Sequence, residues 1–200
     1  MITKDHSIAT DESLIPKVRW SMDLQEMDAG QSSKSGCLKT VSGRYVDLLE
    51  PQPETIELFD IAHGLSFVCR FGGHVPAFYS VAEHSMHVAA QVRRTFGDDH
   101  LALYGLLHDA TEAFLGDVVR PLKLSMDAYR AVEELFARAI ESRFSLPAGS
   151  LDDERVKATD KAILPWEMAM VRDCPFRTAN DPTRVRDAFV ALFFELGGHA

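Results

Sequence analysis

Apolar residues that recur every three or four positions dominate the chain from Glu57 to its end. Leu58, Ile61, Ala62 and Leu65 form the first of these stripes. This spacing places apolar side chains on one face of an α-helix, whereas a half-buried strand alternates apolar and polar residues. We therefore predict a mostly helical fold. Helices are expected near residues 58–68, 81–92, 101–107, 129–140 and 156–171, and from Asp181-Pro182 to a stop at Gly197-Gly198.

The chain before the first helix has a different composition. Residues 1–36 mix charged, small polar and glycine residues with few apolar anchors, which predicts a flexible N-terminal arm. Residues 38–41 and 45–49 are β-favouring runs separated by the turn-forming Ser42-Gly43-Arg44, which predicts a small β-hairpin. We expect residues 37–200 to form one domain of ordinary size.

Composition narrows the classes of partner and compartment. The 30 acidic and 21 basic residues give a formal net charge of −9, which disfavours a nucleic-acid polymer or an anionic membrane as a partner. Cys37, Cys69 and Cys174 are odd in number and lie in no CxxC pattern, so we expect reduced thiols. The chain carries no leader-like segment and no membrane-spanning run, so a cytoplasmic protein is the default expectation.

Two histidines and two aspartates carry the strongest chemical signal. His108 and Asp109 are adjacent in an apolar stretch, and His84 and Asp160 lie in other segments with a helical period. Three helices packed side by side can aim these four side chains into one pocket. Such a mixed imidazole and carboxylate shell suits Mn, Co, Zn or Fe, whereas calcium prefers oxygen ligands and magnesium fits less well.

Further polar residues near this group have the chemistry of a hydrolytic site. Glu112 follows His108 by four positions, so a continuous helix would place both on one face, and we expect Glu112 to orient or deprotonate water. Asp117 is a candidate general acid. Arg70 and Lys123 are candidate phosphate contacts, because guanidinium grips two oxygens and ammonium acts as a compact charge.

Each of these residues also has an ordinary structural explanation. A single histidine beside apolar helix positions is more often a hydrogen-bonded core or surface residue than a metal ligand. Asp160 and Glu112 alone are typical solvated helix residues, and Arg70 and Lys123 are ordinary surface cations. His63, His74 and His87 are competing donors, which we leave outside the expected metal shell.

The order His84, then His108-Asp109, then Asp160 resembles the H…HD…D signature of the HD-domain phosphohydrolase superfamily. The phrases around these residues are similar to its 5′-deoxynucleotidase-like branch, which also contains a phage deoxyadenosine triphosphate triphosphohydrolase. The resemblance covers about residues 38–175. The matching phrases are Asp60-Ile61-Ala62-His63, Cys69-Arg70-Phe71-Gly72-Gly73-His74, Tyr79-Ser80-Val81-Ala82-Glu83-His84-Ser85, the segment around His108-Asp109, and Gly116-Asp117 followed by Pro121-Leu122-Lys123.

The resemblance implies roles for individual residues. It implies that the four signature residues bind the metal, that Glu112 assists catalysis, that Arg70 contacts phosphate and that Asp117 matches the family's Gly-Asp aspartate. Phe71 occupies the place of a bulky residue near the sugar, which suggests crowding against a ribose 2′-hydroxyl. The resemblance also implies a helical bundle and a homo-oligomer.

The expected function is metal-dependent hydrolysis of nucleotide phosphates. We favour release of phosphate from deoxynucleoside 5′-monophosphates, because the sequence shows no extended cluster of cations suited to three phosphates. The alternative within the same chemistry is a deoxynucleoside triphosphate triphosphohydrolase. The alternative from another class is a non-catalytic nucleotide-sensing or scaffold protein that retains the metal site.

Overall fold

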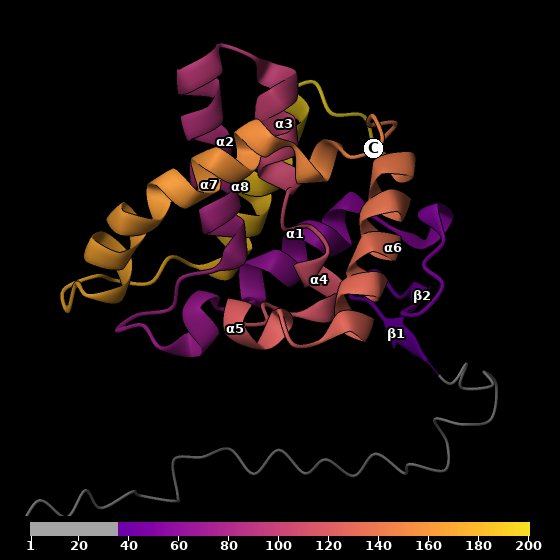
Figure 1. The fold of residues 1–200 in the computed structure, drawn as a ribbon, viewed down its shortest axis with the longest axis horizontal. Helices are drawn as coiled ribbons and strands as arrows, with labels where there is room; N and C mark the ends of the chain where they lie inside the picture. Colours follow the sequence, from indigo (N-terminus) through magenta and orange to yellow (C-terminus); the bar gives the residue numbers. More distant parts are fainter. Residues whose placement is uncertain (1–35) are drawn as a thin grey trace, which may run out of the picture. The chain divides into compact units, whose positions relative to one another are not determined.

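Helices dominate residues 36–200, which are the residues that the computed structural model describes (Figure 1). A two-stranded antiparallel sheet precedes them. The predicted fold class, all-α with a small hairpin, is therefore confirmed. The predicted arm lies outside the described residues, apart from Gly36.

The helical elements comprise long helices, which follow the predicted stripes closely, and short segments that the stripes did not predict. They are η2 (Pro53–Thr55), α1 (Leu58–Phe67), η3 (Arg70–Gly73), α2 (Val81–Phe96), α3 (Asp99–Leu107), α4 (Glu112–Leu115), α5 (Arg120–Lys123), α6 (Asp127–Arg143), η4 (Ser150–Asp152), α7 (Glu154–Glu167), η5 (Met168–Arg172) and α8 (Pro182–Glu195). None of these helices is long and apolar enough to cross a membrane.

The hairpin joins β1 (Cys37–Lys39) to β2 (Tyr45–Asp47), with Leu38 opposite Val46. Its turn is tied to α1, because the backbone N–H and the hydroxyl of Ser42 both donate to the carboxylate of Asp60, at 2.9 and 2.7 Å. Asp60 is buried. A buried carboxylate that receives two hydrogen bonds fixes the hairpin against the first helix.

Side-chain caps set where the long helices begin. The Ser80 hydroxyl accepts from the Glu83 N–H while the Glu83 carboxylate accepts from the Ser80 N–H, and this capping box starts α2. The Asp181 carboxylate accepts from the N–H groups of Thr183 and Arg184, and Pro182 occupies the first turn of α8, as predicted. The start of α2 fixes the position of His84, one turn further along.

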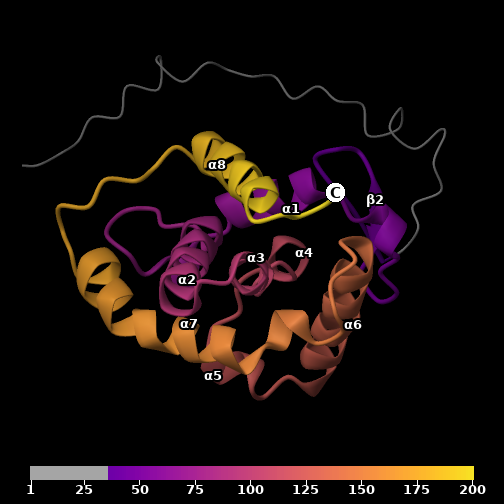
Figure 2. The ribbon, with the colours of Figure 1, turned by 90° about the horizontal axis from the view of Figure 1, so that it is seen from above.

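Helices α2 and α3 form the centre of the described fold. Figure 2 shows them between α1 and α8 on one side and α7 on the other. Gly105 permits the close packing of α2 and α3, since a Cβ at this position would lie 3.3 Å from the Ala89 Cα. The residues around this contact, including Leu106 and Val88, are fully buried.

A second close approach brings α4 against α1. A Cβ at Gly64 would lie 2.7 Å from the Ala113 carbonyl oxygen, which is closer than a real side chain comes. Glycine is therefore required at this point. The contact holds the short helix that begins at Glu112 against the core.

The predicted continuous helix through the His108-Asp109 pair is wrong. Helix α3 ends at Leu107, and residues 108–111 form tight turns before α4. The N–H groups of Ala110 and Glu112 donate to the carbonyls three residues back, at 2.9 and 3.0 Å. This tighter winding changes the direction of successive side chains, so the helical spacing between His108 and Glu112 does not apply.

Candidate metal centre

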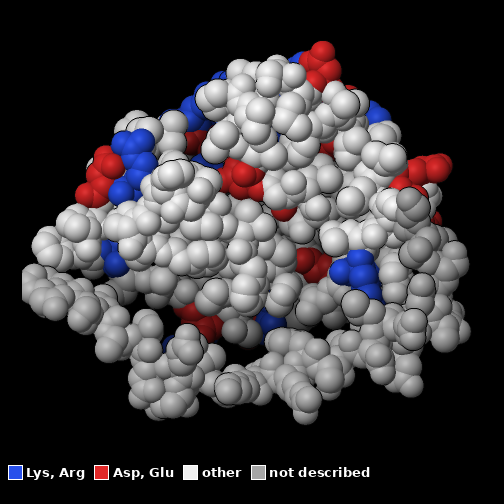
Figure 3. All heavy atoms as spheres, turned by 90° about the horizontal axis from the view of Figure 1, so that it is seen from below, with Lys and Arg blue, Asp and Glu red and all other residues white. Residues whose placement is uncertain are grey.

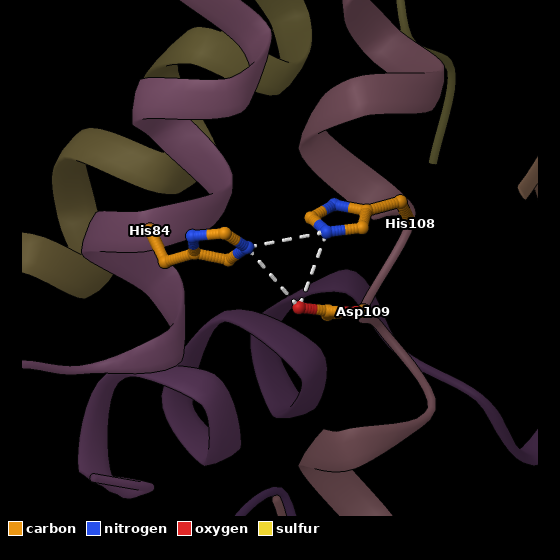
Figure 4. Close-up of side chains that lie close together, drawn as sticks. All are labelled: His84, His108 and Asp109. Atoms are coloured by element: carbon orange, nitrogen blue, oxygen red, sulfur yellow. Dashed lines mark hydrogen bonds and ion pairs between the residues drawn. The ribbon is translucent and has the colours of Figure 1, made fainter. Parts of the chain in front are cut away.

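Donor atoms from three residues converge at the C-terminal end of α3 (Figure 4). The Nε2 atoms of His84 and His108 lie 3.3 Å apart. Asp109 Oδ2 lies 3.4 Å from the first and 3.2 Å from the second. These atoms lie within 4.8 Å of one another, so the three residues could hold one metal ion.

The outer nitrogen of each imidazole is held by an acceptor. His108 Nδ1 lies 2.8 Å from the carbonyl oxygen of Gly105, and His84 Nδ1 lies 2.7 Å from Glu167 Oε1. Because a carbonyl and a carboxylate accept hydrogen bonds, each Nδ1 carries the proton in the neutral ring. Each Nε2 then presents a lone pair to the shared point, which is the arrangement that metal-binding histidines adopt.

Asp160 approaches the same point from α7. Its Oδ1 lies 3.2 Å from His84 Nε2 and its side chain is 38% exposed, whereas His84 is fully buried. The structure thus brings the fourth predicted donor to His84. The tight three-residue group of convergent donors does not include it.

Electrostatics favour a positive charge at this point. Burial alone would lower the pKa of His84, but hydrogen bonds with Asp109, Asp160 and Glu167 raise it to about 10. Burial would raise the pKa of Asp109, but the charges and hydrogen bonds of His108 and His84 hold it well below its usual range. The pKa of Asp160 is also lowered against burial, mainly by its hydrogen bond with His84. Both aspartates are therefore ionised at neutral pH.

Glu167 is a residue that the sequence-based prediction missed. It is fully buried at the end of α7. Its Oε1 accepts hydrogen bonds from His84 and Tyr79, and its Oε2 accepts one from Arg70. The only sequence signal is its spacing: Glu167 follows Asp160 by seven residues, about two helical turns, so both lie on one face of α7. Its partners are 83 or more residues away, which local patterns do not reveal.

A hydrogen-bond chain continues from Glu167 to His87. The Tyr79 hydroxyl donates to Glu167 at 2.8 Å, so its oxygen accepts from His87 Nδ1, also at 2.8 Å. Tyr79 and His87 also line a cavity of about 660 Å³ with Trp166. None of the three convergent donors lies in the wall of this cavity, so it is separate from the candidate metal centre.

Arg70 lies beside the donors but is already engaged. Its guanidinium nitrogens lie 3.2 Å from Glu167 Oε2 and 3.6 Å from Asp109 Oδ2. The next residue, Phe71, has a φ of 57°, a left-handed conformation that is strained for a bulky side chain. Such strain occurs frequently at functional sites. The Phe71 ring lies against the Arg70 guanidinium, with its centroid 5.5 Å from Arg70 Cζ.

The predicted acid, base and second cation lie on residues 108–123. Glu112 is buried, and its Oε2 has no hydrogen-bond partner among the described residues. Burial, followed by the charges of Asp109 and Asp117, raises the pKa of Glu112 well above its usual range. Burial likewise raises the pKa of Asp117. Lys123 lies 3.6 Å from Glu112 Oε1 but donates at 2.6 Å to Glu133 on α6.

The two other competing histidines lie outside the group of convergent donors. The His63 ring contacts two rings of α1: it stacks on Phe59 with centroids 6.3 Å apart, and it lies tilted against Phe67 with centroids 4.5 Å apart. His74 is exposed at the end of η3.

Comparison with known proteins finds relatives without an assigned activity. No protein-family model matches the chain. An uncharacterized protein of Rhodobacter capsulatus is 42% identical over 116 residues, and the uncharacterized protein YfdR of Escherichia coli is 37% identical over 110 residues. Each match covers 55% of this chain and 59% of the relative, so the chain spans about three fifths of the length of these curated relatives.

Proposed function

We propose that this protein is a metal-dependent phosphohydrolase that releases phosphate from deoxynucleoside 5′-monophosphates. The observation that carries the proposal is the convergence of His84, His108 and Asp109 beside the guanidinium of Arg70. A cation held by these donors and a phosphate held by Arg70 would be neighbours. The resemblance of the sequence to HD-domain phosphohydrolases supports the same chemistry.

The donor set favours a first-row divalent ion. Two imidazole nitrogens and a carboxylate oxygen, with Asp160 as a fourth ligand, suit Mn, Fe, Co or Zn better than the all-oxygen shells of calcium or magnesium. When bound, such an ion polarises phosphate oxygens and lowers the pKa of water. The chain's own contribution is to hold both aspartates ionised and to turn the Nε2 atoms of both imidazoles toward the shared point.

Arg70 and Glu112 would act on opposite parts of the substrate. Arg70 keeps its charge when buried, because Glu167 and Asp109 counter the effect of desolvation on its pKa. It can therefore bind and orient a phosphate. The free Oε2 of Glu112 would orient water or take its proton, and Asp117, whose pKa is raised, would donate a proton to the leaving oxygen.

The distribution of cations favours a substrate with one phosphate. Arg70 pairs with Glu167 and with the metal donor Asp109, whereas the ammonium of Lys123 pairs with Glu133, so of these two cations Arg70 is the one that lies beside the donors. On the face shown in Figure 3, Lys and Arg side chains form small separate groups within a mostly uncharged surface. Such a surface suits a small ligand better than a nucleic-acid polymer. We further propose that Phe71 disfavours a ribose 2′-hydroxyl.

A substrate panel tests this proposal. The purified protein would be assayed with Mn, Co, Zn and Mg for phosphate and triphosphate released from deoxy- and ribonucleoside mono- and triphosphates. We expect phosphate from deoxynucleoside monophosphates with a transition metal. Released triphosphate would favour the triphosphohydrolase. Metal and nucleotide binding without any turnover would favour the sensing or scaffold protein and contradict an enzyme.

A further inference from the structure

The carboxylate of Glu167 contacts both halves of the candidate site. Its Oε1 accepts a hydrogen bond from Nδ1 of the proposed metal ligand His84, at 2.7 Å. Its Oε2 accepts one from a nitrogen of the proposed phosphate contact Arg70, at 3.2 Å. Its side chain has no exposure to solvent. A buried charge of this kind is stable only when its partners remain in place.

Helix α7 holds His84 by both ring nitrogens. Asp160 Oδ1 lies 3.2 Å from Nε2, and Glu167 Oε1 lies 2.7 Å from Nδ1. Seven residues advance about 10.5 Å along an α-helix and return to nearly the same face, so the carboxylates of Asp160 and Glu167 can contact opposite nitrogens of one imidazole. The helix changes to a π-helical turn directly after Glu167, and such turns frequently occur at functional sites.

The same carboxylate orients Arg70. One guanidinium nitrogen faces Glu167 and another lies 3.6 Å from Asp109, so Glu167 holds the cation next to a metal donor. The Arg70 side chain is 14% exposed, so solvent can still reach it while its guanidinium is paired with the buried Glu167. Movement of Glu167 would therefore displace the imidazole and the guanidinium together.

We infer that Glu167 is a positioning residue that couples metal retention to phosphate binding, an inference that rests on the proposed function. Glu167 fixes the tautomer of His84 through Nδ1 and fixes the direction of Arg70 through its second oxygen. Carboxylates that hold metal-binding histidines in this way commonly change metal affinity by 10- to 100-fold when mutated.

Glutamine at this position cannot replace both interactions. Both oxygens of Glu167 receive donors, whereas a glutamine amide offers one oxygen and one donor group. If the amide oxygen faces His84 and Tyr79, the amide nitrogen faces a nitrogen of Arg70. We expect Glu167→Gln to weaken metal affinity by about 10- to 100-fold. We expect it to weaken affinity for inorganic phosphate by about tenfold or more, the range for hydrogen bonds to charged groups.

Two further variants make the experiment specific. Glu141→Gln is the matched control, because Glu141 is also a buried glutamate but accepts from the backbone N–H of Leu151. Tyr79→Phe removes one hydrogen bond to Oε1 and leaves both charges in place. Tyr79→Phe should weaken metal affinity by only about two- to tenfold, with unchanged phosphate affinity, because it removes a hydrogen bond to Glu167 and leaves the one between Glu167 and His84 in place. It tests the metal half of the coupling even if Glu167→Gln fails to fold.

The measurements are calorimetric titrations of metal-stripped protein with Co²⁺ or Mn²⁺, then of metal-saturated protein with inorganic phosphate. Loss of both affinities in Glu167→Gln, with Glu141→Gln retaining both, is the predicted result. Normal metal affinity in Glu167→Gln or in Tyr79→Phe, or a loss of metal affinity alone in Glu167→Gln, would overturn the coupling. A wild-type protein that binds metal and phosphate but hydrolyses no nucleotide would contradict the proposed function and leave this inference intact. A wild-type protein that binds no metal would overturn both.

Discussion

The donor side and the turn side of the candidate site are built differently. The donor side, His84 on α2 with Asp160 and Glu167 on α7, lies on long helices, and His84 is hydrogen bonded at both ring nitrogens. The turn side, residues 112–123, consists of two four-residue helices and the loop that joins them, and the buried Glu112 Oε2 has no partner among the described residues. An unsatisfied buried oxygen costs free energy, so such atoms usually have a role. The comparison teaches that the long helices fix His84 and Asp160, that the tight turns after α3 carry His108 and Asp109, and that residues 112–123 present groups that a substrate can satisfy.

The largest expected effect comes from removing the residue shared by both sides. Asp109→Ala should abolish metal retention and hydrolysis, because Asp109 contacts both imidazoles and Arg70. Loss of several kcal/mol of charge stabilisation corresponds to about a thousandfold or more in rate. Metal content and phosphate release check this, with Asp99→Ala as a surface control. Full activity in metal-free Asp109→Ala would contradict the mechanism.

A substitution confined to the turn side should reduce turnover and leave metal binding unchanged. Glu112→Gln should lower kcat by about 10²- to 10⁴-fold, the usual contribution of a positioned acid or base. Because the pKa of Glu112 is raised in the fold, this carboxyl destabilises the metal-free protein increasingly as the pH rises from its ordinary value of 4.5 to the raised pKa. Glu112→Gln should therefore have a higher melting temperature in the presence of chelator. The expected rise is about 2–4 °C for each kcal/mol gained in the free energy of unfolding.

These two readouts separate the two sides. Retained metal content with lost turnover in Glu112→Gln would support the division between metal binding and catalysis. Loss of bound metal in this variant would break the comparison, because it would assign Glu112 to the donor side.

The donor side should respond to pH through His84. Its pKa in the metal-free fold is about 10, above its ordinary value of 6.5, so the stabilising effect of its protonation is complete below pH 6.5 and is lost as the pH rises through 10. A binding metal must displace this proton. Metal affinity should therefore rise about tenfold per pH unit between pH 6.5 and 9.

Calorimetry in buffers of different ionisation enthalpy measures the number of protons released per metal bound. Release of about one proton is expected for His84, since both aspartates are already ionised at neutral pH. A pH-independent metal affinity would show that His84 is already deprotonated in the metal-free fold.

The difference between the two sides also explains what the sequence could predict. The donor helices follow from local signals, namely the apolar period of residues 81–92 and 156–171. The direction of Glu112 does not, because the chain leaves α3 at Leu107 and the tight turns end the helical spacing. Nor does the role of Glu167, whose partners depend on how α7 packs against α2.

A smaller effect is expected at the strained loop that borders the turn side. Phe71→Gly removes the ring and relieves a left-handed conformation that costs a non-glycine residue about 1–2 kcal/mol. We expect the ratio of kcat/KM for deoxy- over ribonucleotides to fall by about tenfold, within the range for contacts that discriminate one hydroxyl group. The melting temperature should not fall. An unchanged ratio would show that Phe71 does not contact the sugar.

The smallest expected effect concerns Lys123. Glu133→Gln removes its ion-pair partner and should free the ammonium for the substrate phosphate. Because such partly exposed pairs contribute about 0.2–1 kcal/mol, KM should fall by only about two- to fivefold. The control is the double variant Glu133→Gln with Lys123→Met, in which the decrease in KM should disappear. An increased KM in Glu133→Gln would show that the pair itself positions Lys123.

The central claim is that one divalent ion at His84, His108 and Asp109 supports hydrolysis. Its most direct test is a titration of chelator-stripped protein with Mn²⁺ or Co²⁺, in which bound metal and phosphate released from a deoxynucleoside 5′-monophosphate are measured together. We predict no release without metal and a rate that rises in proportion to bound metal until one equivalent per chain is reached. Full activity in the stripped protein, or one tightly bound equivalent with no release of phosphate, would contradict the account.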